Sequence, residues 1–340
     1  MLTEFTEVKY AMHTRQTALH EWLHSIIKDT PYTVNLLAGD ASFRRYFRLH
    51  LNEQTRIIMD APPEKEAILP FIEIGERLAK QGIHTPSVYA VDYEKGFVLL
   101  EDLGDDLLLN VITPENADKL YTQAMSTLTT LQHTPTNHPQ LPLFDHAFML
   151  TELAIFHEWF LKAYLAMELT EEETSLIQRT FNSLATQISQ QPSVFIHRDY
   201  HSRNLIVLNN AMGVIDFQDA MQGPFTYDLV SLLKDCYIQW PHEKLMRWLA
   251  LFHGDLPKEL NMPFSEFNRA FDFCGLQRHL KVLGVFCRLH LRDKKPAYLK
   301  DLPLTFHYTM ASLERYEEFQ AFYHFMQQRV QPLFLKASST

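Results

Sequence analysis

The period of the hydrophobic positions changes along the chain and divides it into two parts. In the first hundred residues, short apolar runs bounded by turn residues predict β-strands, which fall at 32–37, 43–51, 56–60, 88–92 and 96–100. Two longer segments, 13–28 and 64–81, carry apolar residues every three or four positions and predict helices. The first part is therefore expected to be a small antiparallel sheet with one main helix.

From residue 107 onward most segments have the helical period instead. The first predicted helix begins at 113–116. The others span 145–167, 170–190, 226–237, 242–252, 264–273 and 275–291, and two more follow 301–303. One stretch departs from this period. The apolar run 194–196 predicts a strand, and the runs 205–207 and 213–215, separated by Asn209-Asn210, predict a β-hairpin. Together the two parts predict an α+β fold.

The polar residues between these strands carry the candidate chemistry. His197-Arg198-Asp199 follows the first strand directly, Asn204 comes five residues after Asp199, and the hairpin delivers Asp216. Phosphoryl transfer needs one carboxylate beside the acceptor hydroxyl, and it needs an amide oxygen and a second carboxylate to hold magnesium on the ATP phosphates. The spacing therefore predicts Asp199 as the catalytic residue and Asn204 and Asp216 as metal ligands.

Two other interpretations of these residues, a purely structural turn and a zinc site, explain the pattern less well than phosphoryl transfer does. The polar groups can simply cap and turn a strand–loop–hairpin unit, but three side chains of these types at this spacing exceed what a turn requires. His197 and His201 are four positions apart, which is the spacing of a zinc-binding pair on one helix face. Because His197 ends a β-type run, the two histidines are not expected to share such a face.

Composition narrows the class of partner. The length of 340 residues suggests two lobes, the hydrophobic fraction of 46% supports an ample core, and the net charge of -10 gives no sign of a nucleic-acid partner. Cys236, Cys274 and Cys287 have neither paired nor C-x-x-C spacing. With no signal-peptide pattern and no apolar run near the roughly 20 residues of a membrane span, we expect a cytoplasmic location. The chain is also expected to be a monomer that acts on a small molecule.

The catalytic segment resembles that of the aminoglycoside phosphotransferase and choline kinase group, because Asp216 lies only twelve residues beyond Asn204 with no long activation loop between them. The phrases at 39–48, 59–64 and 100–105 are most similar to the anomeric kinases of N-acetylmuramate and N-acetylglucosamine used in peptidoglycan recycling. The resemblance implies a bilobal protein-kinase-like fold. Its N-lobe, 1–103, binds the nucleotide, and its mainly helical C-lobe, 104–340, carries the catalytic loop and the sugar.

The same resemblance assigns nucleotide contacts in the first lobe. It implies ATP and Mg2+ as cofactors, with Ser42 in the turn over the phosphates and the backbone of Glu101, Asp102 and Leu103 at the adenine. Kinases of this group carry a lysine on the third strand, where this chain has Met59. The nearby cations that can replace it are Arg44, Arg45, Arg48 and Lys65, and we expect one arginine of the first hairpin, Arg44 or Arg48, to do so. A helix carboxylate is expected to partner the replacing cation, with Glu73 favoured over Glu66 by spacing.

Five residues are predicted substrate contacts: Asp199, Arg203, Asp219, Arg288 and Arg292. N-acetylmuramate carries a lactyl carboxylate that N-acetylglucosamine lacks, and arginine binds carboxylates through two parallel hydrogen bonds. Arg288 and Arg292 are four positions apart on one helical face, so one of them is expected to contact that carboxylate.

Three alternatives stay open from the sequence alone. The first is a kinase of the same fold with another acceptor, such as an aminoglycoside, choline, homoserine or another sugar. The second is a protein kinase, which the missing activation loop disfavours. The third is a catalytically dead binding module, which Met59 favours and the intact Asp199, Asn204 and Asp216 disfavour.

Overall fold

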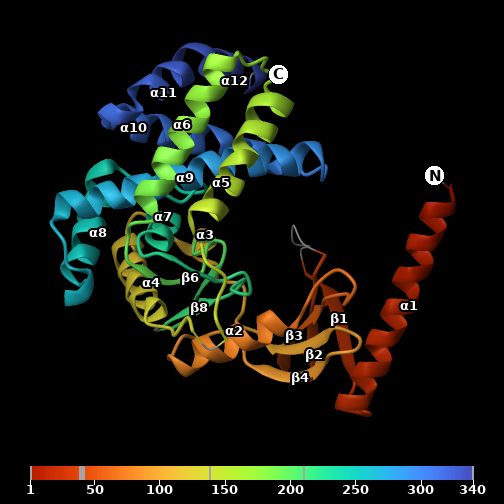
Figure 1. Ribbon diagram of the computed structural model, residues 1–340. Helices are drawn as coiled ribbons and strands as arrows, with labels where there is room; N and C mark the ends of the chain where they lie inside the picture. Colours follow the sequence, from red (N-terminus) through yellow and green to blue (C-terminus); the bar gives the residue numbers. More distant parts are fainter. Residues whose placement is uncertain (1, 38–42, 138, 210, 339–340) are drawn as a thin grey trace. The chain divides into compact units, whose positions relative to one another are not determined.

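A computed structural model of the chain describes residues 2–37, 43–137, 139–209 and 211–338 (Figure 1). The chain forms two compact units, one made of residues 1–79 and 84–105 and the other of residues 80–83 and 106–340. The first unit is a five-stranded antiparallel sheet with two helices, and the second is mainly helical. The predicted α+β class is therefore confirmed. No described helix is long and apolar enough to cross a membrane.

The sheet of the first unit has the strand order β1-β2-β3-β5-β4. Its strands are β1 (Tyr32–Leu36), β2 (Arg45–Leu51), β3 (Gln54–Asp60), β4 (Val88–Asp92) and β5 (Phe97–Glu101). The long helix α1 (Leu2–Ile27) packs against the sheet through Leu19, Trp22 and Leu23, which share one buried cluster with Ile58 and Phe97. Alternation along the strands puts these apolar side chains on one face, so burial of that face holds helix and sheet together.

One close backbone contact in this unit depends on a glycine. Gly96, in the β4–β5 turn, has φ +70°, and a Cβ there would overlap the carbonyl oxygen of Ala61. Only glycine allows this close approach, in which the Gly96 carbonyl also accepts the N–H of Ala61.

The helix predicted at 64–81 is α2 (Leu69–Lys80). The predicted start was five residues early, because 63–65 form a turn and 66–68 are not helical.

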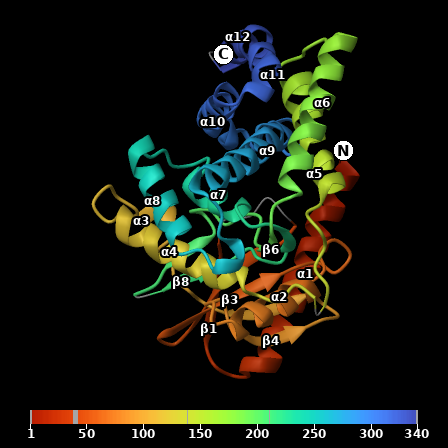
Figure 2. The ribbon, with the colours of Figure 1, turned by 60° about the vertical axis from the view of Figure 1, so that its left-hand side comes forward.

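The second unit contains the remaining helices (Figure 2). They are α3 (Leu108–Val111), α4 (Ala117–Gln132), α5 (His146–Ile155), the π-helix η1 (Phe156–Tyr164), α6 (Glu171–Ile188), α7 (Tyr227–Leu233), α8 (His242–Gly254), α9 (Phe264–Leu291), α10 (Leu302–Arg315), α11 (Gln320–Phe325), the π-helix η5 (Met326–Val330) and α12 (Gln331–Ser338). Three short 3-10 turns complete it, at Lys258–Leu260, Pro296–Asp301 and Glu317–Phe319. The predicted end of the helix at 226–237 was wrong, because α7 ends at Leu233.

Helix α9 is the centre of this unit and packs against α5, η1, α6, α7 and α10 (Figure 2). The sequence predicted a break near Gly275, but α9 is continuous, because tertiary packing overrides the modest helix penalty of a single glycine. At Gly284 a Cβ would overlap the backbone of Ile155 and Phe156. The absence of a side chain there lets α9 lie directly against the junction of α5 and η1.

Two small β-elements are set into the helices and frame the catalytic loop. Strand β6 (Ser193–Ile196) pairs antiparallel with β9 (Met221–Pro224), and β7 (Leu205–Val207) pairs with β8 (Met212–Val214). The predicted strand and the predicted hairpin are both confirmed. Residues 197–204 connect β6 to β7, and residues 215–220 connect β8 to β9, so the two connections carry the motif residues.

Candidate active site

The catalytic loop is anchored from helix α7 and the turn after it. The buried carboxylate of Asp228 accepts the backbone N–H groups of His197 at 2.6 Å and Arg198 at 2.9 Å. Asp235, also buried, accepts the N–H of Ser202 at 3.0 Å. Loop N–H groups that no strand satisfies are thus paired with buried carboxylates, which makes the loop conformation costly to change.

Two residues of the site have left-handed backbone conformations, with φ +77° at Arg198 and φ +63° at Asp216. A non-glycine residue in this region costs about 1–3 kcal/mol, and such residues persist only where their surroundings fix them. For Arg198 the fixing contacts are the Asp228 carboxylate on its N–H and Nη1 of Arg278 on its carbonyl oxygen, at 2.7 Å. The strained backbone therefore lies directly before Asp199, at Arg198, and at Asp216 itself.

His197 is a structural residue of the loop. Its ring is buried, with Nε2 2.9 Å from the carbonyl oxygen of Ile215 and Nδ1 3.3 Å from the N–H of Asp199. A neutral ring protonated on Nε2 satisfies both contacts, and burial lowers the pKa of His197 accordingly. Both ring nitrogens are therefore engaged within the protein, and the zinc interpretation of His197 and His201 is not supported.

The structure brings Asp199, Asn204 and Asp216 together. Nδ2 of Asn204 donates to the carbonyl oxygen of Asp199 at 2.9 Å and to Oδ2 of Asp216 at 3.3 Å. Nε2 of Gln218 donates to Oδ1 of Asp216 at 2.8 Å. Because the amide nitrogen of Asn204 is occupied by acceptors, its Oδ1 is the atom that can ligate a metal.

This donor set fits Mg2+. An amide oxygen and a carboxylate are hard oxygen ligands, and Mg2+ is commonly held by one or two carboxylates while phosphates and water supply the rest. Within the described parts of the chain, no three His, Cys, Asp or Glu side chains come together in an arrangement that can hold a metal. An ion held at Asn204 and Asp216 would therefore take its remaining ligands from phosphate oxygens and water.

Helix α9 and helix α5 surround Asp199 with charge. Glu152, on α5, accepts Nη2 of Arg198 at 2.8 Å, Nζ of Lys281 at 3.0 Å and Nε2 of Gln277 at 3.0 Å. Nη1 of Arg278 lies 3.2 Å from Oδ1 of Asp199. Desolvation raises the pKa of Asp199, but the positive charges of Lys281 and Arg278 outweigh it, so the net pKa lies well below the ordinary value. Asp199 is therefore ionised at neutral pH.

The predicted nucleotide residues lie in the first unit. Arg48 bonds two carboxylates: its Nε lies 2.7 Å from Asp102, and its Nη1 and Nη2 each lie 2.8 Å from Asp105. Arg44 is buried and lies 3.0 Å from Glu66. Glu66 is therefore the carboxylate that pairs with Arg44, whereas Glu73 is exposed.

The other predicted nucleotide residues are placed as follows. Met59 is fully buried on β3 opposite Val98, so no cation projects from that strand position. Glu101 ends β5 and accepts the hydroxyl of Ser87, and Leu103 is half-buried beyond it. Ser42 lies outside the described residues. The roles of these groups toward a nucleotide stay predictions.

The predicted substrate contacts are not equally available. Arg292 is exposed and its guanidinium is bound by Asp293, at 2.8 and 2.9 Å. Arg288 is half-buried, and Nε of Arg288 is buried with no hydrogen-bond partner among the described residues. Arg203 stacks on the ring of Tyr237, with 3.7 Å from its guanidinium carbon to the centroid. Asp219 is exposed.

Four residues of the site escaped the sequence prediction, namely Glu152, Gln218, Arg278 and Lys281. Arg278 and Lys281 are three positions apart in a largely apolar part of α9, and that pairing was the one available signal. Glu152 gave no signal, because it stands 46 residues from the loop residue that it binds. Gln218 stands where the kinase D-F-G triplet has glycine. This difference alone did not identify Gln218 as a site residue, and its hydrogen bond to Asp216 does.

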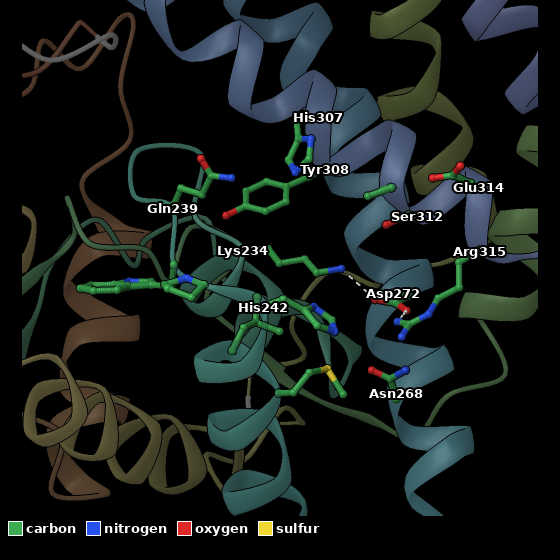
Figure 3. Close-up of a pocket in the computed structure, with 15 residues that line it drawn as sticks. Lys234, Gln239, His242, Asn268, Asp272, His307, Tyr308, Ser312, Glu314 and Arg315 are labelled. Carbon is green, nitrogen blue, oxygen red and sulfur yellow. Dashed lines mark hydrogen bonds and ion pairs between the residues drawn. The ribbon is translucent and has the colours of Figure 1, made fainter. Parts of the chain in front are cut away.

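A cavity of 440 Å³ lies elsewhere in the second unit (Figure 3). Lys234 and Arg315 both point at Asp272, at 2.8 and 2.7 Å from its two carboxylate oxygens. The lining residues are Lys234, Gln239, Trp240, Pro241, His242, Leu245, Met246, Asn268, Asp272, His307, Tyr308, Ala311, Ser312, Glu314 and Arg315. None of them is a motif residue, so this cavity is separate from the catalytic loop.

Comparison with known proteins agrees with this geometry. The sequence profile of the family described as "Phosphotransferase enzyme family" matches residues 33–259. The chain is 41% identical to an N-acetylmuramate/N-acetylglucosamine kinase of Pseudomonas aeruginosa over 83% of this chain and 84% of that protein. It is 36% identical to a protein of the same name from Neisseria meningitidis, over 91% and 94% of the two chains.

Solved structures extend the comparison to the fold. An aminoglycoside 2'-phosphotransferase in its GDP complex matches 87% of this chain and 99% of its own length, with a TM-score of 0.63 at 15% identity. An ethanolamine kinase of Plasmodium vivax matches 88% and 87% of the two chains, with a TM-score of 0.63 at 12% identity. At these identities the likeness concerns the fold alone, and it agrees with the predicted kinase-like architecture.

Proposed function

We propose that this chain, which belongs to the phosphotransferase enzyme family, is a kinase that uses ATP to phosphorylate the anomeric hydroxyl of N-acetylmuramate and N-acetylglucosamine in peptidoglycan recycling. Support for the sugar comes from relatives that carry this kinase name and match most of the chain. Support for the reaction comes from one observation, the meeting of Asp199, Asn204 and Asp216 in the same loop region.

Each of these residues has a role that its surroundings favour. Asp199 is ionised and half-exposed, so it can accept a hydrogen bond from the sugar hydroxyl and orient it toward the phosphoryl group. The hydroxyl proton passes to this carboxylate as the bond to phosphorus forms and the bond to ADP breaks. A carboxylate with a low pKa is a weak base, which suits a loose transition state in which the proton leaves late.

Asn204 and Asp216 are the residues that would hold Mg2+. The ion supplies neutralisation of charge on the transferring phosphoryl group. Gln218 and Asn204 together fix both oxygens of Asp216, so this carboxylate keeps one orientation before any ligand binds. Positioning and electrostatics of this kind provide most of the acceleration in phosphoryl transfer.

The test is a panel of acceptors incubated with the purified chain, ATP and magnesium. The panel contains N-acetylmuramate, N-acetylglucosamine, an aminoglycoside, choline and homoserine. We expect turnover with the first two and a phosphorus coupling to the C1 proton in the NMR spectrum of the product. Phosphate at another hydroxyl, or turnover only with another acceptor, would refute the proposal. Nucleotide binding without turnover on any acceptor would favour a dead binding module.

A further inference from the structure

Arg278 connects helix α9 to the catalytic carboxylate. Its Nη1 donates to the carbonyl oxygen of Arg198 at 2.7 Å and lies 3.2 Å from Oδ1 of Asp199. One guanidinium nitrogen therefore contacts both the backbone that precedes Asp199 and the carboxylate itself. The side chain of Arg278 is 4% exposed and that of Asp199 is 41% exposed, so the contact reaches Asp199 from the protein side.

The position of Arg278 is itself fixed by its helix. Its neighbour Gln277 and the next-turn residue Lys281 both bind Glu152 on α5. Farther along α9, Gly284 allows direct backbone packing against Ile155. These contacts hold α9 at two points along its length, so the guanidinium has little freedom to follow a moving loop.

Three cations meet two carboxylates in this cluster. The three cations Arg198, Arg278 and Lys281 face the two carboxylates Glu152 and Asp199. Lys281 and Arg198 are both bonded to Glu152, which leaves Arg278 as the cation in contact with Asp199. The Arg278–Asp199 contact therefore cannot be replaced by a neighbouring cation without breaking the Glu152 pairs.

We propose that Arg278 is the positioning residue of Asp199, and that it holds Oδ1 so that Oδ2 is the oxygen that receives the acceptor hydroxyl. This inference rests on the proposed function, since it assigns a role within the same reaction. An arginine suits the task because its planar, pre-organised fork loses little freedom for each hydrogen bond that it forms. Arg278 does not need to touch the substrate, and its effect passes through Asp199.

A double-mutant cycle tests this assignment. Arg278→Met removes the guanidinium and keeps apolar bulk, and we expect kcat to fall by about a hundredfold, the scale of misplacing a reacting group. The KM values for ATP and sugar should stay within about threefold, because Arg278 binds neither. In the Asp199→Asn background the same substitution should lower kcat by less than about threefold, because the group that it positions has lost its charge. Equal losses in both backgrounds, or wild-type kcat in Arg278→Met, would overturn the proposal.

A matched control and a second variant complete the experiment. Arg269, on the same helix, is likewise paired with a carboxylate, that of Glu318, and none of its hydrogen bonds or ion pairs among the described residues reaches the catalytic loop. Arg269→Met should therefore leave kcat unchanged, and a loss like that of Arg278→Met would show a general effect of α9. If Arg278→Met fails to fold in a thermal melt, Arg278→Lys keeps the buried charge, and the same cycle is run with it.

Failure of the proposed function is distinguishable from failure of this inference. A wild-type chain that is inactive on every acceptor would defeat the sugar-kinase proposal. A crystal structure of Arg278→Met then still decides the positioning role, because the Asp199 side chain should leave its wild-type rotamer. An unchanged Asp199 rotamer in that structure would overturn the inference.

Discussion

The carboxylate of Asp228 receives the backbone N–H of His197 at 2.6 Å, so a buried side chain of α7 fixes the entry to the catalytic loop. Burial raises the pKa of Asp228 to about 6, although nearby His197 and the bound N–H groups oppose the shift. The folded protein therefore binds a proton at Asp228 more tightly than the unfolded chain, in which an aspartate ionises near pH 4.

The sign of the resulting pH dependence follows from this difference. The stability contributed by the raised pKa of Asp228 is fully present below about pH 4 and is lost as the pH rises through about 6, by up to about 3 kcal/mol. Asp228→Asn cannot ionise. Urea unfolding of both proteins from pH 4 to pH 7 should show the wild type losing stability relative to the variant. A constant difference across that range would contradict the prediction.

Removal of the charge on Asp199 should slow turnover without weakening nucleotide binding. Asp199→Asn keeps the shape of the side chain but removes the oxygen that accepts the hydroxyl proton, so we expect kcat to fall by at least about a hundredfold. The dissociation constant of ADP, measured by calorimetry, should stay within about twofold. Wild-type turnover in this variant would show that Asp199 is not the catalytic carboxylate.

Substitution of the predicted metal ligands should change the affinity for nucleotide and not only the rate of turnover. Asp216→Ala removes a carboxylate, and we expect it to abolish the magnesium dependence of ADP affinity in calorimetry. Asn204→Ala should weaken that dependence less severely, because it removes a neutral ligand. Asp219→Asn is the matched control, since it removes an exposed carboxylate three residues from Asp216. Normal magnesium dependence in both alanine variants would show that the hairpin is structural only.

What the sequence could predict is local in the chain. His197, Asp199, Asn204 and Asp216 fall within 20 residues, and the strands on either side are short apolar runs, so spacing alone placed them. Asp228, near the start of α7, braces the same loop by accepting its backbone N–H groups. The fold class followed from the change of hydrophobic period.

What the sequence missed depends on contacts between distant segments. Arg278 reaches Asp199 across 79 positions, and Glu152 reaches Arg198 across 46. A pattern of apolar residues shows which face of α9 is buried but not what that face meets. The choice of Glu73 over Glu66 rested on spacing along the chain, whereas the pairing of Glu66 with Arg44 depends on the turn after Pro62-Pro63, which spacing does not reveal.

The missing strand-3 lysine leads to a prediction about two arginines. Arg48 is held by both Asp102 and Asp105, whose charges neutralise it. Arg44 is buried and pairs with Glu66 at 3.0 Å, like the lysine–glutamate pair of kinases. We therefore expect Arg44→Met to raise the KM for ATP by about tenfold, the scale of a charge-assisted hydrogen bond. Arg48→Met is the control and should raise it less. The reverse order would assign the phosphate contact to Arg48.

The two arginines at the end of α9 allow a test of how the acid is recognised. Arg292 already forms two hydrogen bonds with Asp293, so it has little to offer a second carboxylate. Arg288 is different, because its Nε is buried with no hydrogen-bond partner among the described residues. Burial also lowers the pKa of Arg288, with the charge of Arg292 adding to the effect, and an anion nearby would relieve both penalties.

We therefore predict that Arg288, and not Arg292, contacts the lactyl carboxylate of N-acetylmuramate. Arg288→Met keeps the bulk and removes the charge, so the KM for N-acetylmuramate should rise about tenfold or more. The KM for N-acetylglucosamine should change much less, since that sugar has no carboxylate to lose a contact. Arg292→Met, one turn away on the same face, is the matched control and should affect neither sugar. Equal effects of Arg288→Met on both sugars would mean that this arginine supports the fold of the site and does not bind the lactyl carboxylate.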